Sequence, residues 1–175
     1  PMFDEDIHIC ELRTSKGHDL ALAGTQDTPH LAPTLGDNEV CGEETFLFVA
    51  VTTSIRSLRQ RDVIRRTLGD LAERDGRVKL MFALTKSQDA PILREAEEHN
   101  DIIFLEGTES YDTLSDKSLR LFQWVTIHCP TTNYFMKIDD DSFVQFTPLL
   151  QKLLDMKAAK SVYMGHIFPK TAGVS

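Results

Sequence analysis

Three successive aspartates, Asp139, Asp140 and Asp141, lie between two apolar segments in the stretch NYFMKIDDDSFV. Adjacent carboxylates repel one another, so a cation or a cationic partner is expected beside them. Alternate side chains of an extended segment point to the same side, so Asp139 and Asp141 are expected to converge. Two convergent carboxylates suit a hard divalent cation, Mn²⁺ or Mg²⁺, with substrate phosphate oxygens completing its coordination. An acidic turn exposed to solvent is the alternative.

A lysine stands on the apolar side of a predicted helix. Lys117 shares one helical stripe with Leu114, Leu121, Trp124 and His128. A charged residue on the core side of a helix is unusual. Its amine either extends to the surface along the helix, or reaches the same site as the aspartates and binds a phosphate. The sequence leaves both alternatives open.

Five arginines follow the first apolar segment, in the stretch SIRSLRQRDVIRRTLG. Arg61 and Arg65 are four residues apart and share a helical face, a spacing that suits a grip on a pyrophosphate or on an aspartate. A solvated basic face is the alternative explanation for such a run.

The three cysteines, Cys10, Cys41 and Cys129, show neither a CxxC pair nor zinc-ligand spacing. A Cys10–Cys41 bridge would suit an oxidising compartment, and free thiols are the alternative. His128 and Cys129 are neighbours on a predicted helix, where their side chains point about a hundred degrees apart. They are therefore not expected to act as a Cys–His pair, and His128 is expected to pack in the core.

The composition is that of a soluble globular protein, with 41% hydrophobic and 26% charged residues among 175. A formal net charge of −8 argues against nucleic acid as a partner, because phosphate backbones are bound by clustered Lys and Arg. No apolar run approaches the ~20 residues of a membrane span, and no signal peptide is visible.

The chain divides into an irregular leader, residues 1–44, and one domain, residues 45–175. In the domain, apolar strands alternate with helices, which predicts an α/β fold with a mostly parallel sheet and helices on both faces. Ligands of such sheets bind beyond the carboxyl ends of the strands, where the aspartates are expected. The predicted strands are 46–53, 78–85, 101–106, 134–138 and 161–165, and the predicted helices are 57–71, 89–100, 111–129 and 147–157.

Four motifs resemble, in order, those of the beta-1,3-glycosyltransferase family, which includes beta-1,3-galactosyltransferases and beta-1,3-N-acetylglucosaminyltransferases. The first, R-x-A-I-R-x-T-W-G in the family, is RDVIRRTLG here. The second, D-x-Y-x-N-L-T-x-K-T followed by W and C, is ESYDTLSDKSLRLFQWVTIHC. The third, F-x-x-K-x-D-D-D-x-F-V-N, is YFMKIDDDSFVQ, and the fourth, Y-x-G, is YMG. The resemblance covers residues 46–170 and implies a GT-A-type nucleotide-diphospho-sugar transferase fold.

The chain departs from the family pattern at three motif positions. Leu68 stands in the place of Trp, and Thr113 and Gln145 stand in the place of Asn. The family's later acidic E-D-V segment has no counterpart before Ser175. The fold is therefore expected to be truncated at its C-terminal side, with the catalytic base beyond that residue.

The resemblance implies a hexosyltransferase that moves galactose or N-acetylglucosamine from a UDP-sugar to a glycan acceptor on a glycoprotein or glycolipid. The implied reaction forms a beta-1,3 linkage by a single inverting displacement. Asp139 and Asp141 would hold Mn²⁺ or Mg²⁺ against the UDP diphosphate, and Asp140 would lie near the ribose or sugar. Thr52 and Thr53 would border the nucleotide pocket.

Further residues are implied with supporting roles: Arg61, Arg65 and Lys117 would support the pocket or the phosphates. The family also implies a type II membrane protein of the Golgi lumen, whose anchor would precede Pro1. Two other functions stay open on the residues alone, a metal-dependent phosphohydrolase or nuclease and a non-catalytic nucleotide- or glycan-binding module.

Overall fold

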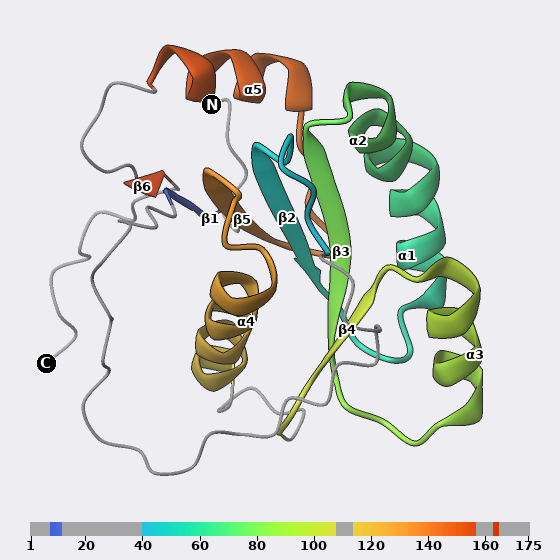
Figure 1. Ribbon diagram of the computed structural model, residues 1–175. Coiled ribbons are helices and arrows are strands. Elements are labelled where there is room, and N and C mark those ends of the chain that lie inside the picture. The colour runs from blue at the N-terminus through green and yellow to red at the C-terminus, as the bar shows by residue number, and fades with distance from the viewer. Residues whose placement is uncertain (1–7, 12–39, 108–113, 157–162, 165–175) are drawn as a thin grey trace, which may run out of the picture.

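The computed structural model describes residues 8–11, 40–107, 114–156 and 163–164. Among these residues, six strands form one sheet in the order β4-β3-β2-β5-β1-β6 (Figure 1). Strands β2 to β5 run parallel to their neighbours among them, whereas β1 is antiparallel to both β5 and β6. The predicted α/β fold with a mostly parallel sheet is confirmed. The strands are β1 (His8–Glu11), β2 (Leu47–Thr52), β3 (Val78–Thr85), β4 (Ile102–Leu105), β5 (Tyr134–Asp139) and β6 (Tyr163–Met164).

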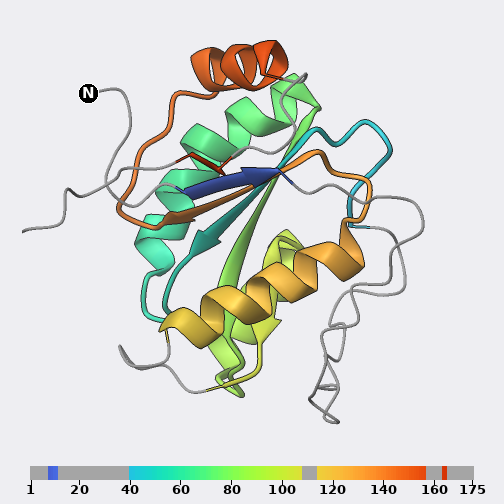
Figure 2. The same ribbon diagram turned by 90° about the vertical axis from the view of Figure 1, so that its left-hand side faces the viewer.

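Helices cover both faces of the sheet. Figure 2 shows α4 in front of one face, with α1 and α2 behind the other. Helices α3 and α5 contribute to the same core as α1 and α2. The helical segments are α1 (Leu58–Ile64), the π-helical η1 (Arg65–Gly69), α2 (Asp70–Asp75), α3 (Ala90–His99), α4 (Leu114–His128) and α5 (Phe146–Asp155).

The central strand β2 is buried on both faces, as its continuous apolar sequence predicted. Leu47, Val49 and Val51 face the core that α1, α3 and α5 complete. Phe48 and Ala50 face a second core, completed by α4. Because successive side chains of a strand alternate between faces, one six-residue strand contributes to both cores.

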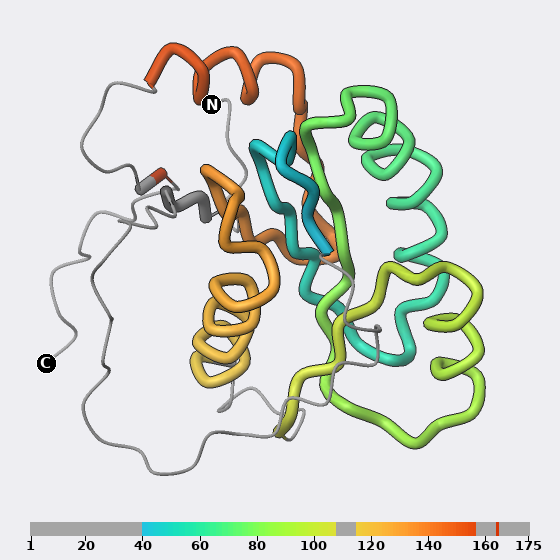
Figure 3. The backbone as a smooth tube through the Cα atoms, viewed as in Figure 1, coloured from blue at the N-terminus to red at the C-terminus, as the bar shows by residue number. Residues whose placement is uncertain are grey.

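The first long helix differs from its prediction over 57–71. It continues to Asp75 through the π-helical segment η1, and ends at Gly76 in the left-handed conformation. Figure 3 shows the backbone of α1, η1 and α2 as one continuous coil. Leu68 and Ala72 are buried four residues apart on the inner face, whereas Leu71 is exposed.

One strand was missed by the sequence analysis, which assigned residues 1–44 to an irregular leader. Residues 8–11 form β1, paired with β5 from His8 opposite Lys137 to Glu11 opposite Tyr134. Four residues are too few to show a clear alternation, and the pairing partner lies more than a hundred residues along the chain. The division of the chain at residue 44 stays a prediction.

A disulfide joins Cys41, just before β2, to Cys129, just after α4. The considered Cys10–Cys41 bridge is therefore wrong. Both joined cysteines are buried in the core between α4 and the sheet. The bond closes a loop with a sequence separation of 88 and ties α4 to the start of the central strand.

Two arginines link α1 and η1 to α3. Arg61, fully buried, donates to both carboxylate oxygens of Glu95, over 2.6 and 2.7 Å, and to the carbonyl oxygen of Ser54 over 2.5 Å. Arg65 donates to Glu95 over 2.8 Å and to the two carboxylate oxygens of Asp101 over 2.7 and 2.9 Å. Because Ser54 follows β2, Arg61 fixes the loop at the carboxyl end of that strand.

The ionisation of this cluster follows from its contacts. Burial by itself would raise the pKa of Glu95, but the hydrogen bonds from Arg61 and Arg65 outweigh it, and the pKa lies below its ordinary value. Burial would lower the pKa of Arg65, but its bonds to Asp101 and Glu95 raise it. Both groups are charged at neutral pH.

Within the described ranges, no helix combines the length and the apolar composition that crossing a bilayer requires.

We expect loss of the disulfide to lower the free energy of unfolding by about 2–4 kcal/mol, because the unfolded chain regains the entropy of a long loop. Urea unfolding of the wild type with and without reductant measures this, and reductant should not affect the Cys41→Ser variant further. Peptide mapping under non-reducing conditions should recover Cys41 linked to Cys129. Recovery of Cys10 linked to Cys41 would contradict this pairing.

We expect Glu95→Gln to lower the free energy of unfolding by about 3–5 kcal/mol, because it leaves the Arg61 guanidinium buried without its counter-charge. Since the folded-state pKa of Glu95 is lowered, its contribution is present above the ordinary glutamate pKa of about 4.3 and is lost as the pH falls through the folded value. Denaturation curves at pH 7 and at decreasing pH test both statements. The matched control is Glu98→Gln, at an exposed position of the same helix. Equal stabilities of the two variants at pH 7 would contradict the assignment.

Candidate functional site

The order in which the chain adds strands to the sheet reverses at β2. From β2 the chain proceeds to β3 and β4 on one side, whereas β5 pairs with β2 on the other side. Open parallel sheets bind ligands at such a switch point, beyond the carboxyl ends of the two strands. Here the carboxyl ends are Thr52 and Asp139, which are register partners. The aspartate triplet therefore lies where the sequence analysis expected it.

Two threonines of β2 and its following loop contact two aspartates of β5 and its following turn. The hydroxyl of Thr52 donates to the Oδ1 of Asp139 and, over 3.1 Å, to the carbonyl oxygen of Ile138. The hydroxyl of Thr53 donates to the Oδ2 of Asp140 over 2.6 Å. Four of the predicted site residues, Thr52, Thr53, Asp139 and Asp140, are thus brought together across the switch point.

Lys117 reaches this edge of the sheet from α4. Its Nζ donates to the carbonyl oxygen of Thr53 over 3.1 Å, and its side chain is half-buried. Of the two alternatives left open by the sequence, the structure shows the one in which the amine extends toward the site. Binding of a phosphate by Lys117 stays a prediction.

A second lysine at the site was missed. The Nζ of Lys137 lies 2.9 Å from the Oδ1 of Asp139, and Lys137 is two residues earlier on the same strand. Residues two apart on a strand point to the same face. The spacing Lys-x-Asp, present in the printed sequence, could have revealed this pair once the strand had been assigned.

Asp141 lies in the turn that follows β5 and is exposed. The amide of Ser142 donates to the carbonyl oxygen of Asp139 over 3.1 Å, which closes the turn. Among the residues that the structure describes, no group of three or more His, Cys, Asp or Glu side chains is arranged to hold a metal ion. The convergence of Asp139 and Asp141 on one cation stays a prediction.

Arg61 and Arg65 bind carboxylates that lie outside the aspartate triplet. The side chain of Arg61 is fully buried against Glu95, so it can contribute to a ligand site only through the loop that it holds. Arg65 binds Glu95, Asp101 and Asp62. Of the two predicted partners, a pyrophosphate or an aspartate, the structure shows an aspartate, Asp101, at Arg65, and both arginines also bind Glu95, which was not predicted.

The residues after the triplet divide between core and surface. Val144 is buried, whereas Phe143 is 63% exposed, so the two apolar residues do not pack together beneath the turn. His128 is half-buried with its ring 4.5 Å from that of Trp124, and burial lowers its pKa. Cys129 is in the disulfide, so it cannot act as a nucleophile with His128.

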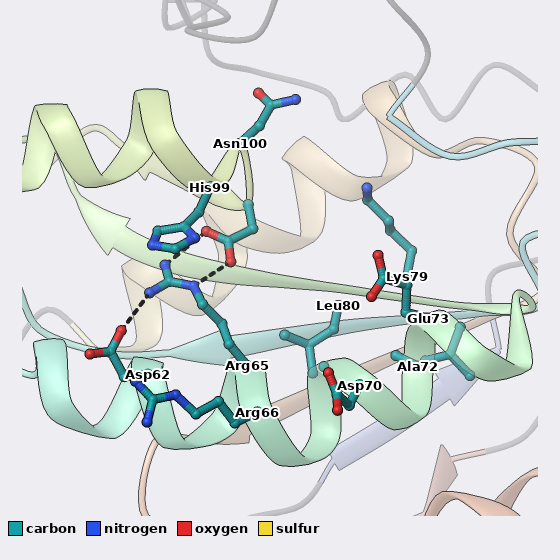
Figure 4. Close-up of a pocket in the computed structure, with 13 residues that line it drawn as sticks. Asp62, Arg65, Arg66, Asp70, Ala72, Glu73, Lys79, Leu80, His99 and Asn100 are labelled. Carbon is teal, nitrogen blue, oxygen red and sulfur yellow. Dashed lines mark hydrogen bonds and ion pairs between the residues drawn. The ribbon is translucent and has the colours of Figure 1, made fainter.

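A groove of about 500 Å³ lies elsewhere, between the continuous helix formed by α1, η1 and α2 and the amino ends of β3 and β4. Figure 4 shows Arg65 inside it, with its guanidinium directed toward Asp62. The groove is lined by both signs of charge, including Asp70, Glu73 and Lys79. Because its charged groups offset one another and it opens away from the carboxyl ends, we do not assign the groove to the candidate site.

Comparison with known proteins agrees with the motifs at this edge. Beta-1,3-galactosyltransferase 4 of Mus musculus is 35% identical over 117 residues, covering 65% of this chain and 32% of that protein. Beta-1,3-galactosyltransferase 5 of Mus musculus is 35% identical over 130 residues, covering 71% of this chain and 42% of that protein. N-acetyllactosaminide beta-1,3-N-acetylglucosaminyltransferase 4 of Homo sapiens is 31% identical over 133 residues, covering 73% of this chain and 35% of that protein.

The chain thus spans between 32% and 42% of the length of the two galactosyltransferases. The galactosyltransferase family model matches residues 59–175, which include α1 except its first residue, Lys117 of α4 and the aspartate triplet. This match extends over more than half of the chain. The chain belongs to the galactosyltransferase family.

Proposed function

We propose that this chain is the donor-binding part of a metal-dependent, inverting beta-1,3-hexosyltransferase. It binds a UDP-sugar and takes part in moving galactose or N-acetylglucosamine to a glycan acceptor. The observation that carries the proposal is the pairing of Thr52 and Thr53 with Asp139 and Asp140 at the switch point of the sheet. Membership of the galactosyltransferase family supports the class of reaction.

The polar groups at this edge fit a nucleoside diphosphate. Thr52 and Thr53 border the nucleotide pocket in this proposal, and Asp140 lies near the ribose or sugar. Lys117, held at the Thr53 carbonyl, brings a positive charge to the carboxyl end of β2. Arg61 supports the site indirectly, because its hydrogen bonds to Ser54 and Glu95 fix the loop after β2.

The donor chemistry of the site fits Mn²⁺ or Mg²⁺, which prefer oxygen ligands. Asp139 is 41% exposed at its side chain and Asp141 is exposed, so both can be approached from solvent. A site of two carboxylates leaves coordination positions for phosphate oxygens. Asp139 and Asp141 are the residues that would hold the cation, which when bound supplies positive charge that stabilises the UDP leaving group.

The residues of this chain have positioning and electrostatic roles in the proposed reaction. Thr52 orients the Asp139 carboxylate, and Thr53 orients that of Asp140, through their hydroxyl donors. Inversion requires a base that takes the proton of the acceptor hydroxyl as the new bond forms. We assign that base to none of the described residues.

We place the protein in the Golgi lumen as part of a type II membrane protein. The disulfide between Cys41 and Cys129 supports an oxidising compartment, because such bonds are rare where glutathione and thioredoxin keep thiols reduced. To test this placement, we would compare the fraction of protein that carries the Cys41–Cys129 disulfide in secretory-pathway membranes with the fraction after expression in the cytosol.

We expect Asp141→Asn to weaken Mn²⁺-dependent UDP binding at least tenfold while the fold stays intact. The residue is exposed, and its removal also relieves repulsion within the triplet, so stability should hold or rise slightly. Calorimetric titration with UDP and Mn²⁺, together with thermal unfolding, measures both effects. The control is Asp155→Asn on α5, which makes the same charge change at another exposed position. Unchanged UDP affinity of the Asp141→Asn protein would refute the metal assignment.

The function itself is tested with UDP-galactose or UDP-N-acetylglucosamine, Mn²⁺ and a panel of glycan acceptors. We expect saturable, Mn²⁺-dependent binding of the donor by this chain, and sugar transfer by the protein that also carries the base. Binding without transfer by that longer protein would indicate a non-catalytic module. Release of phosphate would indicate a hydrolase, and absence of donor binding would refute the proposal.

A further inference from the structure

Lys137 lies within the sheet, and its ammonium group contacts Asp139, one of the carboxylates of the candidate site. It stands on β5, opposite Ala50 of the central strand β2, and its side chain is 21% exposed. Its Nζ lies 2.9 Å from Asp139 Oδ1, the same oxygen that accepts from Thr52. An amine that is mostly removed from water needs a counter-charge, and Asp139 supplies it.

Because of this contact, the ammonium group of Lys137 would lie beside any metal ion that binds Asp139. A divalent cation at the carboxylate would lie close to the ammonium group, and like charges at short distance repel. The repulsion disfavours binding of the metal alone. A diphosphate beside the pair would attract both cations, so it would offset the repulsion and favour binding of the metal.

We propose that Lys137 makes metal binding at Asp139 depend on the diphosphate. In the ligand-free protein its ammonium pairs with Asp139, and when metal and nucleotide bind together the ammonium group faces the phosphates. Lys137 is thus a positioning and coupling residue of the donor site. The inference rests on the proposed function, since it takes a nucleoside diphosphate as the anionic partner.

The consequence is measurable as linkage. If Lys137 couples the two ligands, UDP strengthens Mn²⁺ binding and Mn²⁺ strengthens UDP binding by the same factor, within the usual range of about 5- to 150-fold. Removing the ammonium group should strengthen binding of Mn²⁺ alone and weaken binding of UDP in the presence of Mn²⁺. A residue with a merely structural role would not shift the two affinities in opposite directions.

The test measures Mn²⁺ affinity by electron paramagnetic resonance without nucleotide, and UDP affinity by calorimetry with and without Mn²⁺. For Lys137→Met we expect Mn²⁺ alone to bind about two- to fivefold more tightly, and the coupling factor to fall at least fivefold. Lys137→Arg, which keeps the charge, should retain most of the coupling. Lys79→Met is the matched control, because it removes one lysine charge at the amino end of β3.

Lys137→Gln provides a second neutral variant, and thermal unfolding verifies that each protein is folded. Equal coupling in the wild type and both neutral variants would overturn the inference. Failure of the wild type to bind UDP with Mn²⁺ would instead overturn the proposed function, and the inference with it.

Discussion

The parallel ladder between β2 and β5 aligns Thr52 with Asp139, and the geometry of the candidate site depends on that register. A slip by one residue would turn Asp139 and Lys137 toward the opposite core, because side chains alternate along a strand. Apolar burial prevents the slip. Val49 and Phe48 are fully buried on opposite faces of β2, so a shifted strand would place each of them against the wrong layer.

Charged groups inside the protein maintain the loop beside this ladder. Arg61 binds Glu95 of α3 through two hydrogen bonds and also holds the Ser54 carbonyl, so it joins a helix on one face to the carboxyl end of the central strand. A buried ion pair adds little net stability compared with an apolar replacement, but it is costly to break. The main effect of the ion pair is therefore to position the loop after β2, because the Arg61 guanidinium makes all of its hydrogen bonds in only one arrangement of that loop.

The site combines negative and positive groups at short range. Asp139 lies between the Thr52 hydroxyl and the Lys137 amine, and Lys117 approaches from α4 to the neighbouring Thr53 carbonyl. In the proposed donor site, local basic groups of this kind would let an anionic nucleotide bind a chain whose net charge is −8. Each of the two proposed ligands, the donor and the cation, would change the charge that the other one meets.

From residue 46 onward, apolar periodicity and βαβ connectivity were enough to predict the order of strands and helices, the doubly buried strand β2 and the place of the aspartates at a carboxyl edge. Motif resemblance likewise identified the family. The tertiary structure alone decided which groups meet: Cys41 with Cys129, Arg61 with Glu95, and β1 with β5. Periodicity reports that a side chain faces the interior, but it carries no information about the partner found there. That choice depends on how distant segments pack, so Arg61 and Arg65 were compatible with a pyrophosphate, with an aspartate or with solvent until the fold showed their carboxylate partners.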